Sequence, residues 1–537
     1  MTIALTASGP AADAVGSVVP SLVRDLVASG ITVQDPSLWG PDAEHEASTR
    51  LGWTESVASS AEIVLRILAL REKLTAKGLT HFVLAGMGGS SLAPEVITRT
   101  YGVDLTVLDA TVPGQVLSAL NDDLEHTVLI VSSKSGSTVE TASARSVFEK
   151  AFSDAGFTDL ADRIVVVTDP GSPLDESARA AGYEVFAADP NVGGRYSALS
   201  AFGLVPAGLA GADIQELLAE ADAVTVELAQ DRPDNPGLVL GAVLAGTTPL
   251  RDKIVLVADG THLQGFPDWA EQLIAESTGK NGRGLLPVVV GVDAPEITAG
   301  LDDVQVIRLV GSTEETREVS PGEVEISGSL GAQFLVWEYA VAVAGRLLGV
   351  NPFDQPDVES AKAATRALLE GSPAPVSAAP SQSAMVTDGI AVRTSPSLEP
   401  GESVSSAVAA LLAHLTGDGY VALHAYVDRF ENPEIVGLRD VLAERTGRPV
   451  TFGWGPRFLH STGQYHKGGP ANGVFLQITQ TPGVDLEIPN SSFTFGALVV
   501  AQAAGDATVL AEHGRPVLTL TVTDVAEALP VILSALR

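Results

Sequence analysis

Short apolar runs alternate with helical patterns between positions 80 and 190. The runs lie near Phe82 and Val128 and at 106–108, 164–167 and 184–186, and β-branched residues fill both faces of the run at Val128. Such runs predict strands that are buried on both sides, as in a parallel sheet. Because helical patterns separate them, we expect a doubly wound α/β domain with helices on both faces of its sheet.

A second alternating region predicts a similar domain further along the chain. Its apolar runs lie at 254–257, 287–290 and 304–307, and a long helix is expected at 332–348. Beyond it, strands are expected within 403–537, together with further helices. The expected fold class is therefore α/β, with two doubly wound parallel sheets and a C-terminal α/β extension.

The segments outside these alternating regions set the expected domain limits. The N-terminal part shows helical patterns, and the stretch before residue 403 is rich in Pro, Ser and Ala, which is typical of a linker or mobile loop. We expect a helical N-terminal segment at 1–50, a first α/β domain at 51–210 and a second α/β domain at 211–370. A linker or mobile loop is expected at 371–402, and a C-terminal region that completes the second domain and the site is expected at 403–537.

The charge and composition narrow the function classes. The chain has 537 residues, with 32 Lys and Arg against 66 Asp and Glu, and a formal net charge of −34. This charge disfavours nucleic acid or an anionic membrane as a partner. The absence of cysteine excludes disulfides, thiolate metal sites and a cysteine nucleophile. We see no signal-peptide pattern and no apolar run long enough to span a bilayer, so we expect a cytoplasmic protein.

One polar turn follows the strand expected near Val128. Residues 132–141 read Ser-Ser-Lys-Ser-Gly-Ser-Thr-Val-Glu-Thr, and a helical pattern follows. Ser137 stands three residues before Glu140, which is a capping-box signature, so the helix is expected to begin there. The hydroxyls, the lysine and the free N–H groups of a helix start suit a dianion such as a phosphate. The alternative is a polar loop that only caps its helix.

A second turn, at 86–91, follows the strand expected near Phe82 and reads Gly-Met-Gly-Gly-Ser-Ser. Its glycines allow the backbone to approach a ligand closely. The spacing is neither the dinucleotide fingerprint nor a Walker loop. Two such turns after two strands of one sheet suggest a single anion held between two helix starts, at the carboxyl ends of the strands.

Two residues are candidates for proton chemistry in the middle of the chain. Arg195 follows paired glycines, and its permanent cation could stabilise an oxyanion, although a surface arginine is the alternative. Glu276 lies near the C-terminal end of a helix expected from residue 268, where the negative end of the helix dipole makes it a better proton acceptor. The alternative is one more exposed glutamate in an acidic protein.

Two histidines and a lysine complete the candidates. His460 and His466 lie in a glycine-rich segment, and histidine is the natural proton donor near neutral pH. A metal site is the rival interpretation, but no carboxylate or third histidine at ligand spacing supports it. Lys362 lies on the helix that follows Asn-Pro-Phe-Asp-Gln-Pro, where a lysine is usually solvated.

Five motifs in this order resemble glucose-6-phosphate isomerases, also called phosphoglucose isomerases. The motifs are Gly-Met-Gly-Gly-Ser at 86–90, Ser-Lys-Ser-Gly-Ser-Thr-Val-Glu-Thr at 133–141, Val-Gly-Gly-Arg-Tyr-Ser at 192–197, Glu-Ser-Thr-Gly-Lys at 276–280, and Asn-Pro-Phe-Asp-Gln at 351–355 with Lys362 beyond it. The resemblance implies two sugar-isomerase (SIS) domains and an active site shared across a homodimer. It also implies interconversion of glucose 6-phosphate and fructose 6-phosphate, in glycolysis and gluconeogenesis, without a cofactor or metal ion.

The resemblance also implies roles for individual residues. Glu276 matches the base that moves a proton between C1 and C2, and Arg195 matches the cation that faces the enediolate. His460 matches the ring-opening histidine, with Lys362 assisting. The residues that match substrate contacts are Gly88, Gly89 and Ser90 in the glycine loop, Ser133, Ser135 and Thr138 in the phosphate loop, with Lys134 and Ser137 inside it, and Gln355.

The place of the histidine segment departs from the usual arrangement of the family. It follows both the Glu276 and the Gln355 segments, as in transaldolase–isomerase fusions, so His466 stays a rival to His460. Two other functions stay open. The protein could be a bifunctional phosphoglucose/phosphomannose isomerase or a non-catalytic SIS protein that binds a sugar phosphate.

Overall fold

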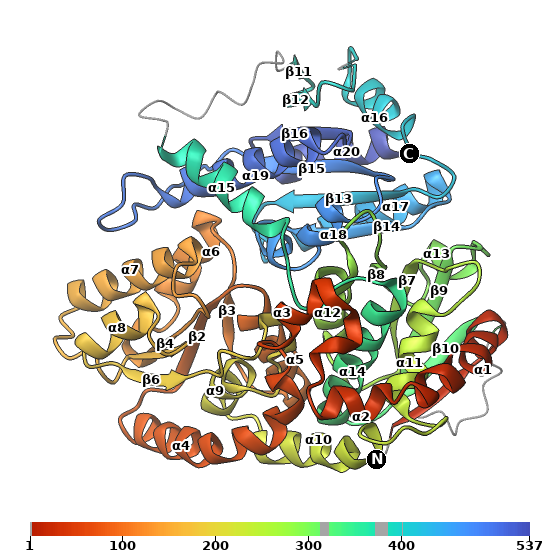
Figure 1. The fold of residues 1–537 in the computed structure, drawn as a ribbon. Coiled ribbons are helices and arrows are strands. Elements are labelled where there is room, and N and C mark those ends of the chain that lie inside the picture. The colour runs from red at the N-terminus through yellow and green to blue at the C-terminus, as the bar shows by residue number, and fades with distance from the viewer. Residues whose placement is uncertain (1–2, 312–319, 321, 371–384, 400) are drawn as a thin grey trace.

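Three sheets divide the chain. The computed structural model describes residues 3–311, 320, 322–370, 385–399 and 401–537, and its strands form sheets of five, five and six strands. The first two sheets lie side by side in the lower half of Figure 1, and the third lies above them. The α/β class with doubly wound parallel sheets is therefore confirmed.

The first sheet is wholly parallel, with the strand order β3-β2-β4-β5-β6. All six residues of β4 are buried, as expected for a central strand covered on both faces. Its elements are α4 (Ser56–Ala76), β2 (His81–Gly86), α5 (Leu92–Tyr101), β3 (Thr106–Leu108), α6 (Pro113–Asn121), β4 (Thr127–Ser132), α7 (Val139–Asp154), β5 (Ile164–Thr168), α8 (Pro173–Ala180), β6 (Glu184–Ala187) and α9 (Ala201–Ala210).

The second sheet has the order β1-β10-β9-β7-β8, and of these five described strands only β1 is antiparallel to its neighbour. The segment 1–50 was expected to be helical, but β1 pairs with β10 before α1 begins. Its elements are β1 (Ala4–Ala7), α1 (Gly9–Arg24), α2 (Val27–Thr32), α3 (Pro41–Ala47), α10 (Ile214–Leu228), α11 (Pro236–Ala245), β7 (Lys253–Asp259), α12 (Phe266–Thr278), β8 (Leu286–Val290), α13 (Pro295–Thr298), β9 (Val304–Val310), β10 (Glu323–Ser327) and α14 (Leu330–Leu348).

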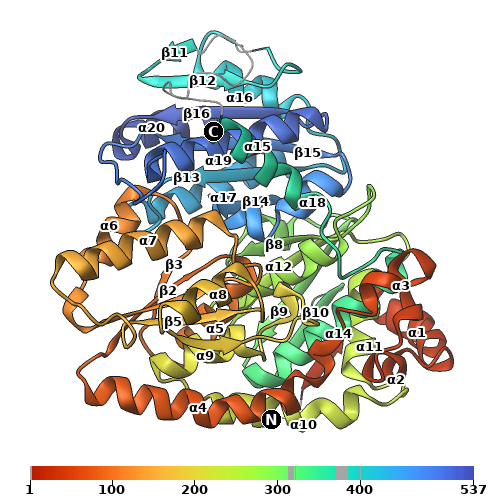
Figure 2. The ribbon, with the colours of Figure 1, turned by 60° about the vertical axis from the view of Figure 1, so that its left-hand side comes forward.

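The C-terminal strands form a sheet of their own, and none of those described joins the second sheet. Figure 2 shows these strands above the other two sheets. Its order is β11-β12-β16-β15-β13-β14, with β13 to β16 parallel. Its elements are α15 (Val358–Glu370), β11 (Met385–Thr387), β12 (Ile390–Thr394), α16 (Val404–Leu412), β13 (Tyr420–Tyr426), α17 (Leu438–Thr446), β14 (Val450–Trp454), α18 (Gly463–Gly468), β15 (Gly473–Gln480), α19 (Phe495–Glu512), β16 (Val517–Val522) and α20 (Val525–Leu536).

Part of the expected linker belongs to this third sheet. Residues 385–394 form the hairpin of β11 and β12, and β12 pairs with β16. The expectation of a linker is therefore wrong for these residues, while 371–384 and 400 lie outside the described residues. The other domain limits stay predictions.

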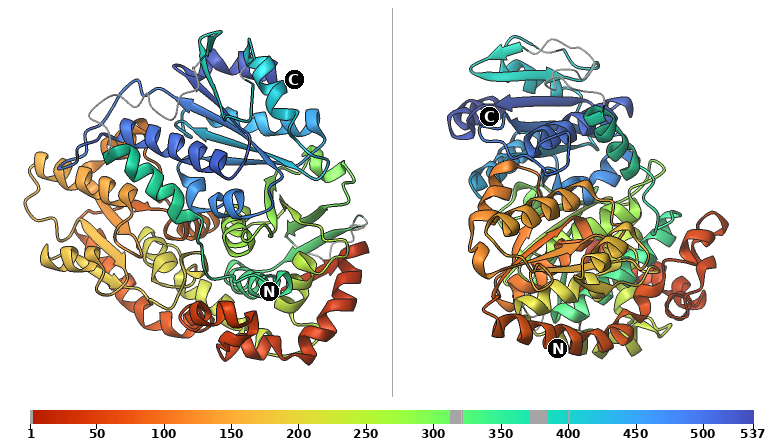
Figure 3. Two further views of the ribbon diagram at one scale, coloured as in Figure 1. Left: turned by 45° about the horizontal axis from the view of Figure 1, so that its top comes forward. Right: turned by 90° about the vertical axis from the view of Figure 1, so that its left-hand side faces the viewer.

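The third unit packs on both other domains. Tyr420, Tyr465 and Phe475 share a core with β7 and β8 of the second sheet, and Phe495 and Leu498 of α19 join a core of the first domain. Figure 3 shows α15 running beside α19. Among the described residues α19 is the only helix long and apolar enough to cross a membrane, and most of it is buried, as in the core of a folded domain.

Candidate functional site

Two polar turns lie at the carboxyl ends of adjacent strands. β2 and β4 are parallel neighbours, with Gly86 opposite Ser132. The short helix η3 (Gly88–Ser90) follows β2, and residues 133–138 follow β4. Both turns therefore open at the same edge of the sheet, where ligands of doubly wound proteins bind.

The turn after β4 gathers hydroxyl groups. Ser133 Oγ lies 3.1 Å from Thr138 Oγ1 and accepts the Gly136 N–H at 3.2 Å. Ser135 Oγ lies 2.9 Å from Ser137 Oγ in an exposed part of the turn. These hydroxyls, together with the N–H groups at the start of α7, are suited to an anion with several oxygens.

The capping box expected at Ser137 is not formed. The N-cap of α7 is Thr138, and its side chain makes no capping hydrogen bond. Ser137 turns its hydroxyl to Ser135, and Glu140 turns its carboxylate to His460. The sequence pattern was right for a helix start but wrong about the partners of these side chains.

The lysine in this turn is already paired. Lys134 Nζ lies 2.8 Å from Asp169 Oδ2 and donates to the Pro190 carbonyl at 3.2 Å. Burial raises the pKa of Asp169, and the ammonium of Lys134 opposes that rise. The paired carboxylate offsets much of the positive charge that Lys134 brings to the turn.

The glycine turn is the point where the segments of the site meet. Gly88 has φ +56°, and a Cβ there would lie 2.7 Å from the His460 carbonyl oxygen and 2.9 Å from Gln272 Nε2. A Cβ at Gly89 would lie 1.9 Å from the Gly194 carbonyl oxygen. Glycine is therefore required here so that three other segments can touch the turn.

Glu276 lies between a cation and an amide. Its Oε1 is 3.6 Å from Arg195 Nη1, and its Oε2 accepts a hydrogen bond from Gln272 Nε2 at 3.0 Å. Arg195 is 2% exposed, and its Nε donates to Ser277 Oγ at 2.8 Å. The carboxylate is thus held on the face of α12 that meets the glycine turn.

Two buried cations hold the loop that carries Gln355. Arg195 donates to Gln355 Oε1 at 2.7 Å and to the carbonyl oxygens of Pro352 and Asp354 at 2.7 and 2.9 Å. Lys280 Nζ donates to the Asn351 carbonyl and to Asp354 Oδ1, both at 2.7 Å. The loop 351–355 is therefore fixed by charge-assisted hydrogen bonds, which are stronger than neutral ones.

The charge of Lys280 predicts how the site responds to pH. Burial lowers the pKa of Lys280 to about 8, and the nearby Arg195 adds to this shift. The ammonium is charged below this pH and neutral above it, so its grip on the loop weakens as the pH rises. We expect kcat to fall above about pH 8, and Lys280→Arg to move the fall to higher pH because a guanidinium stays charged. A pH–rate profile with an unmoved alkaline limb would contradict this expectation.

His460 is held by a residue at the start of α7. Its Nε2 lies 3.1 Å from Glu140 Oε1, and Gln502 Nε2 donates to the same oxygen at 2.7 Å. A carboxylate oxygen can only accept, so Nε2 is the donor in this contact and Nδ1 lies outside it. The first and third domains therefore meet at this histidine.

The rival histidine lies elsewhere. His466 is 1% exposed, and its Nδ1 lies 2.9 Å from the Tyr420 hydroxyl. Burial lowers its pKa well below the usual value, with His424 contributing. The structure thus places His466 in the core of the third domain, away from the glycine turn that touches His460.

In the structure Arg195 contacts both Glu276 and Gln355, and the glycine turn contacts the His460 segment. Lys362 lies on α15, and its side chain lies outside the described residues. Three further residues that contact the expected site residues, or the loop that carries Gln355, are not among the predicted ones. Gln272 lies one helical turn before Glu276, and Glu140 and Lys280 lie inside the quoted motifs, so these spacings were the available signal. The three residues are Glu140, Gln272 and Lys280.

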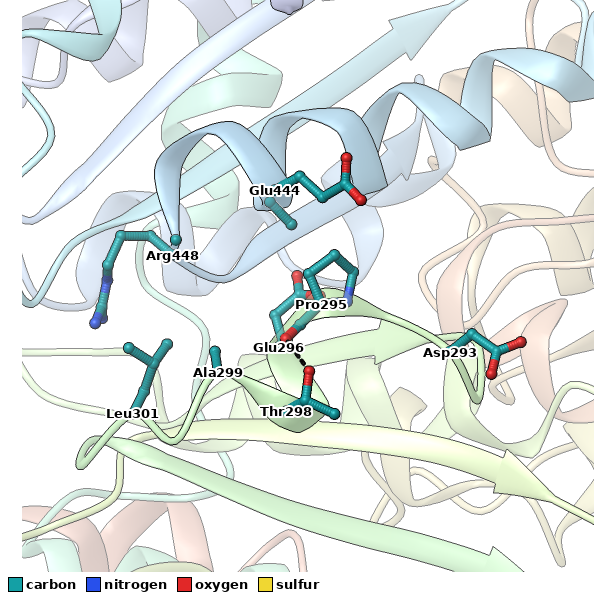
Figure 4. Close-up of a pocket in the computed structure, with 10 residues that line it drawn as sticks. Asp293, Pro295, Glu296, Thr298, Ala299, Leu301, Glu444 and Arg448 are labelled. Atoms are coloured by element: carbon teal, nitrogen blue, oxygen red, sulfur yellow. Dashed lines mark hydrogen bonds between the residues drawn. The ribbon is translucent and has the colours of Figure 1, made fainter.

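A separate cavity of about 430 Å³ lies between α13 and α17. Figure 4 shows Glu296 and Thr298 on one side of it and Glu444 on the other. Its lining includes none of the expected site residues whose side chains the structure describes. Among the described residues, no group of three or more His, Cys, Asp or Glu could hold a metal ion.

Two doubly wound sheets, with glycine-rich and hydroxyl-rich turns at adjacent strand ends, place this protein in the class of doubly wound α/β proteins whose turns at the strand ends are suited to an anionic ligand. The family model described as phosphoglucose isomerase matches residues 69–298. With a relative that is 32% identical and covered over 85% of its length, the chain belongs to the phosphoglucose isomerase family.

Individual relatives support this assignment. The glucose-6-phosphate isomerase of Rubrobacter xylanophilus is 32% identical over 372 residues, which cover 56% of this chain and 85% of that protein. The glucose-6-phosphate isomerase of Thermus thermophilus is 30% identical over 396 residues, which cover 61% and 92%. The crystal structure of a hypothetical protein from Thermus thermophilus has a TM-score of 0.56 and 26% identity, and the match covers 68% of this chain and 99% of that one.

Proposed function

We propose that this chain interconverts glucose 6-phosphate and fructose 6-phosphate through a cis-enediol, as an enzyme of glycolysis and gluconeogenesis. The observation that carries the proposal is the Glu276 carboxylate, which lies 3.6 Å from the Arg195 guanidinium and accepts from Gln272. A single carboxylate beside a permanent cation suits proton transfer between neighbouring carbons. Membership of the phosphoglucose isomerase family supports the choice of substrate.

Each side chain then has a defined task. Glu276 removes the proton from C2 of the open-chain aldose and returns it at C1, while the hydroxyl proton on O2 passes to O1, so that the carbonyl moves from C1 to C2. Arg195 stabilises the negative charge that develops on the two oxygens without giving up its own proton. The phosphate, bound far from these carbons by the turn at 133–138, supplies the binding energy that positions them.

Ring opening is assigned to His460. The ring oxygen must gain a proton while the anomeric hydroxyl loses one, and an imidazole can donate a proton at one of these positions and accept one at the other. Glu140 orients the imidazole through its hydrogen bond to Nε2. We also propose Lys362 as an assisting residue, on the match of its motif alone.

A coupled assay tests the proposal. Purified protein is given fructose 6-phosphate in the presence of a chelator, and the glucose 6-phosphate formed is detected by a dehydrogenase in a second step. The expected result is sustained turnover that needs no added metal or cofactor. Absence of product, together with binding of the sugar phosphate, would favour the non-catalytic alternative.

The phosphate turn predicts a change in KM. Ser135→Ala with Thr138→Ala removes two hydroxyls from the turn, and we expect KM to rise for both sugar phosphates by roughly 100-fold, since each hydrogen bond to a charged group contributes about 1.5–3 kcal/mol and 1.4 kcal/mol corresponds to about tenfold. Inorganic phosphate should also inhibit the variant more weakly. Unchanged KM for both sugars would place the phosphate elsewhere. Ser153→Ala, at the far end of α7, is the control.

Cytoplasmic location and a homodimer stay predictions. The substrates proposed here are hexose 6-phosphates. Neither nucleic acid nor a membrane is proposed as a partner, on the net charge of −34.

A further inference from the structure

One buried amide side chain joins three segments of the site. Gln464, on α18, is 0% exposed. Its Nε2 donates to the Gly279 carbonyl at 2.9 Å and to Asp357 Oδ2 at 2.6 Å, and its Oε1 accepts the Asp357 N–H at 2.9 Å. Both donors of the amide and its acceptor oxygen are therefore used in contacts between segments.

Each of these contacts leads to a different functional residue. Gly279 ends α12 three residues after Glu276, and Asp357 follows Gln355 by two residues. Gln464 itself follows His460 by four residues. The amide thus lies where the segments of the base, of the sugar contact and of the ring-opening histidine come together.

Glycines make this junction as close as it is. A Cβ at Gly279 would lie 2.4 Å from Tyr465 Cα, and one at Gly468 would lie 2.3 Å from Asp357 Oδ2. The Gly282 N–H also donates to the Gly468 carbonyl at 2.9 Å. Helix α18 is therefore seated directly on the backbone that follows α12, and a shift of either element would move the other.

We propose that Gln464 is a positioning residue that sets the distance between Glu276 and His460. The inference rests on the function proposed above. Ring opening and proton transfer act on one substrate, so the histidine and the carboxylate must both reach it at the same time. Among the described residues, Gln464 makes no hydrogen bond to the phosphate turn or to the glycine turn. Its loss should therefore lower kcat and leave the affinity for the phosphate group unchanged.

The experiment compares Gln464→Met with Gln305→Met. Gln305 is also 0% exposed, but its amide donates only to the backbone oxygens of Val306 and Gly322 within the second domain. Both variants lose a buried amide, but only Gln464→Met loses the hydrogen bonds that connect the three segments of the site. We expect Gln464→Met to lower kcat by roughly 100-fold, the effect of misplacing a catalytic group by about 1 Å, with KM and inhibition by inorganic phosphate unchanged. Gln305→Met should keep the wild-type kcat.

A single and a double variant distinguish loss of these hydrogen bonds from misfolding. Gln464→Glu places a carboxylate against Asp357, and Asp357→Asn in the same chain restores a donor between the two side chains. We expect the double variant to recover part of the kcat that Gln464→Glu loses. If Gln464→Met is folded by its melting temperature and turns over at the wild-type rate, or if the double variant recovers nothing, the inference is wrong.

Amide hydrogen exchange separates this inference from the proposed function. In Gln464→Met, exchange should rise in peptides that cover 279–284, 353–358 and 459–468, and in no peptide of the phosphate turn. A wild-type protein without isomerase activity would defeat the proposed function, while the exchange pattern would still report on the junction. Unchanged exchange in all three peptides would defeat the junction even in an active enzyme.

Discussion

Glu276→Gln is expected to lower kcat by roughly 10⁴-fold, the upper range for loss of a general base. The glutamine keeps the shape of the side chain and still accepts the hydrogen bond that Gln272 gives to Glu276. It cannot accept a proton from C2, so the step between aldose and ketose has no base. Binding should persist, because the turn at 133–138 is untouched.

Two measurements make this prediction specific. Exchange of the C2 proton of glucose 6-phosphate with deuterated water should stop in the variant, and inorganic phosphate should compete with the sugar phosphate as in the wild type. The matched control is Glu271→Gln on the same helix, where burial and the neighbouring Asp268 raise the pKa of the carboxyl well above its usual value. Burial already disfavours the charged form of this carboxyl, so replacing it by an amide removes little. Wild-type turnover of Glu276→Gln would remove this residue from the mechanism.

Arg195→Lys is expected to lower kcat by roughly 10²–10³-fold, the range for losing a donor to a developing oxyanion. Lysine keeps the charge, but it lacks the planar fork that reaches several partners at once. Arg195 donates to Ser277, to Gln355 and to two carbonyl oxygens of the loop 351–355. One ammonium with three donors cannot replace all of these contacts.

The control for this variant is Arg283→Lys. Arg283 donates to the Leu348 carbonyl at 3.1 Å, at the exposed edge of the same region, so it reports the cost of an arginine-to-lysine change outside the site. Melting temperatures of both variants separate lost stability from lost chemistry. Arg195→Lys should melt lower than wild type, yet its kcat measured well below that temperature should still be low. A folded variant with wild-type kcat would contradict the assigned role.

Most strands of the first two sheets could be predicted because their signal is local, and the exceptions are β1 and β10. β4 and β5 are runs of β-branched residues that are buried on both faces, and such runs have few other stable conformations. β10 gave no such signal, since it reads Glu-Val-Glu-Ile-Ser, yet all five residues are buried. Its Glu323 is paired with Arg308, and the strand pairs with β1. Both partners are distant in the sequence, so local sequence patterns do not reveal that this segment is a buried strand.

The candidate site also has residues that local motifs could indicate and contacts that they could not. Motif spacing located the two turns, Arg195 and Glu276, because each motif is continuous in sequence. The partners were not predictable, because they come from remote segments. Arg195 meets Gln355 160 residues away, and His460 meets Glu140 320 residues away. For Glu140 a local capping pattern gave a plausible partner, and a contact with the third domain replaced it.

The separation between Glu140 and His460 also bears on synthesis of the chain. The glycine-rich and hydroxyl-rich turns leave the ribosome early, and the histidine emerges 320 residues after its carboxylate partner. A nascent polypeptide that has folded only its first two domains therefore has both polar turns but no imidazole beside Glu140. In the proposed mechanism, ring opening begins only when the third domain has folded and His460 has met Glu140.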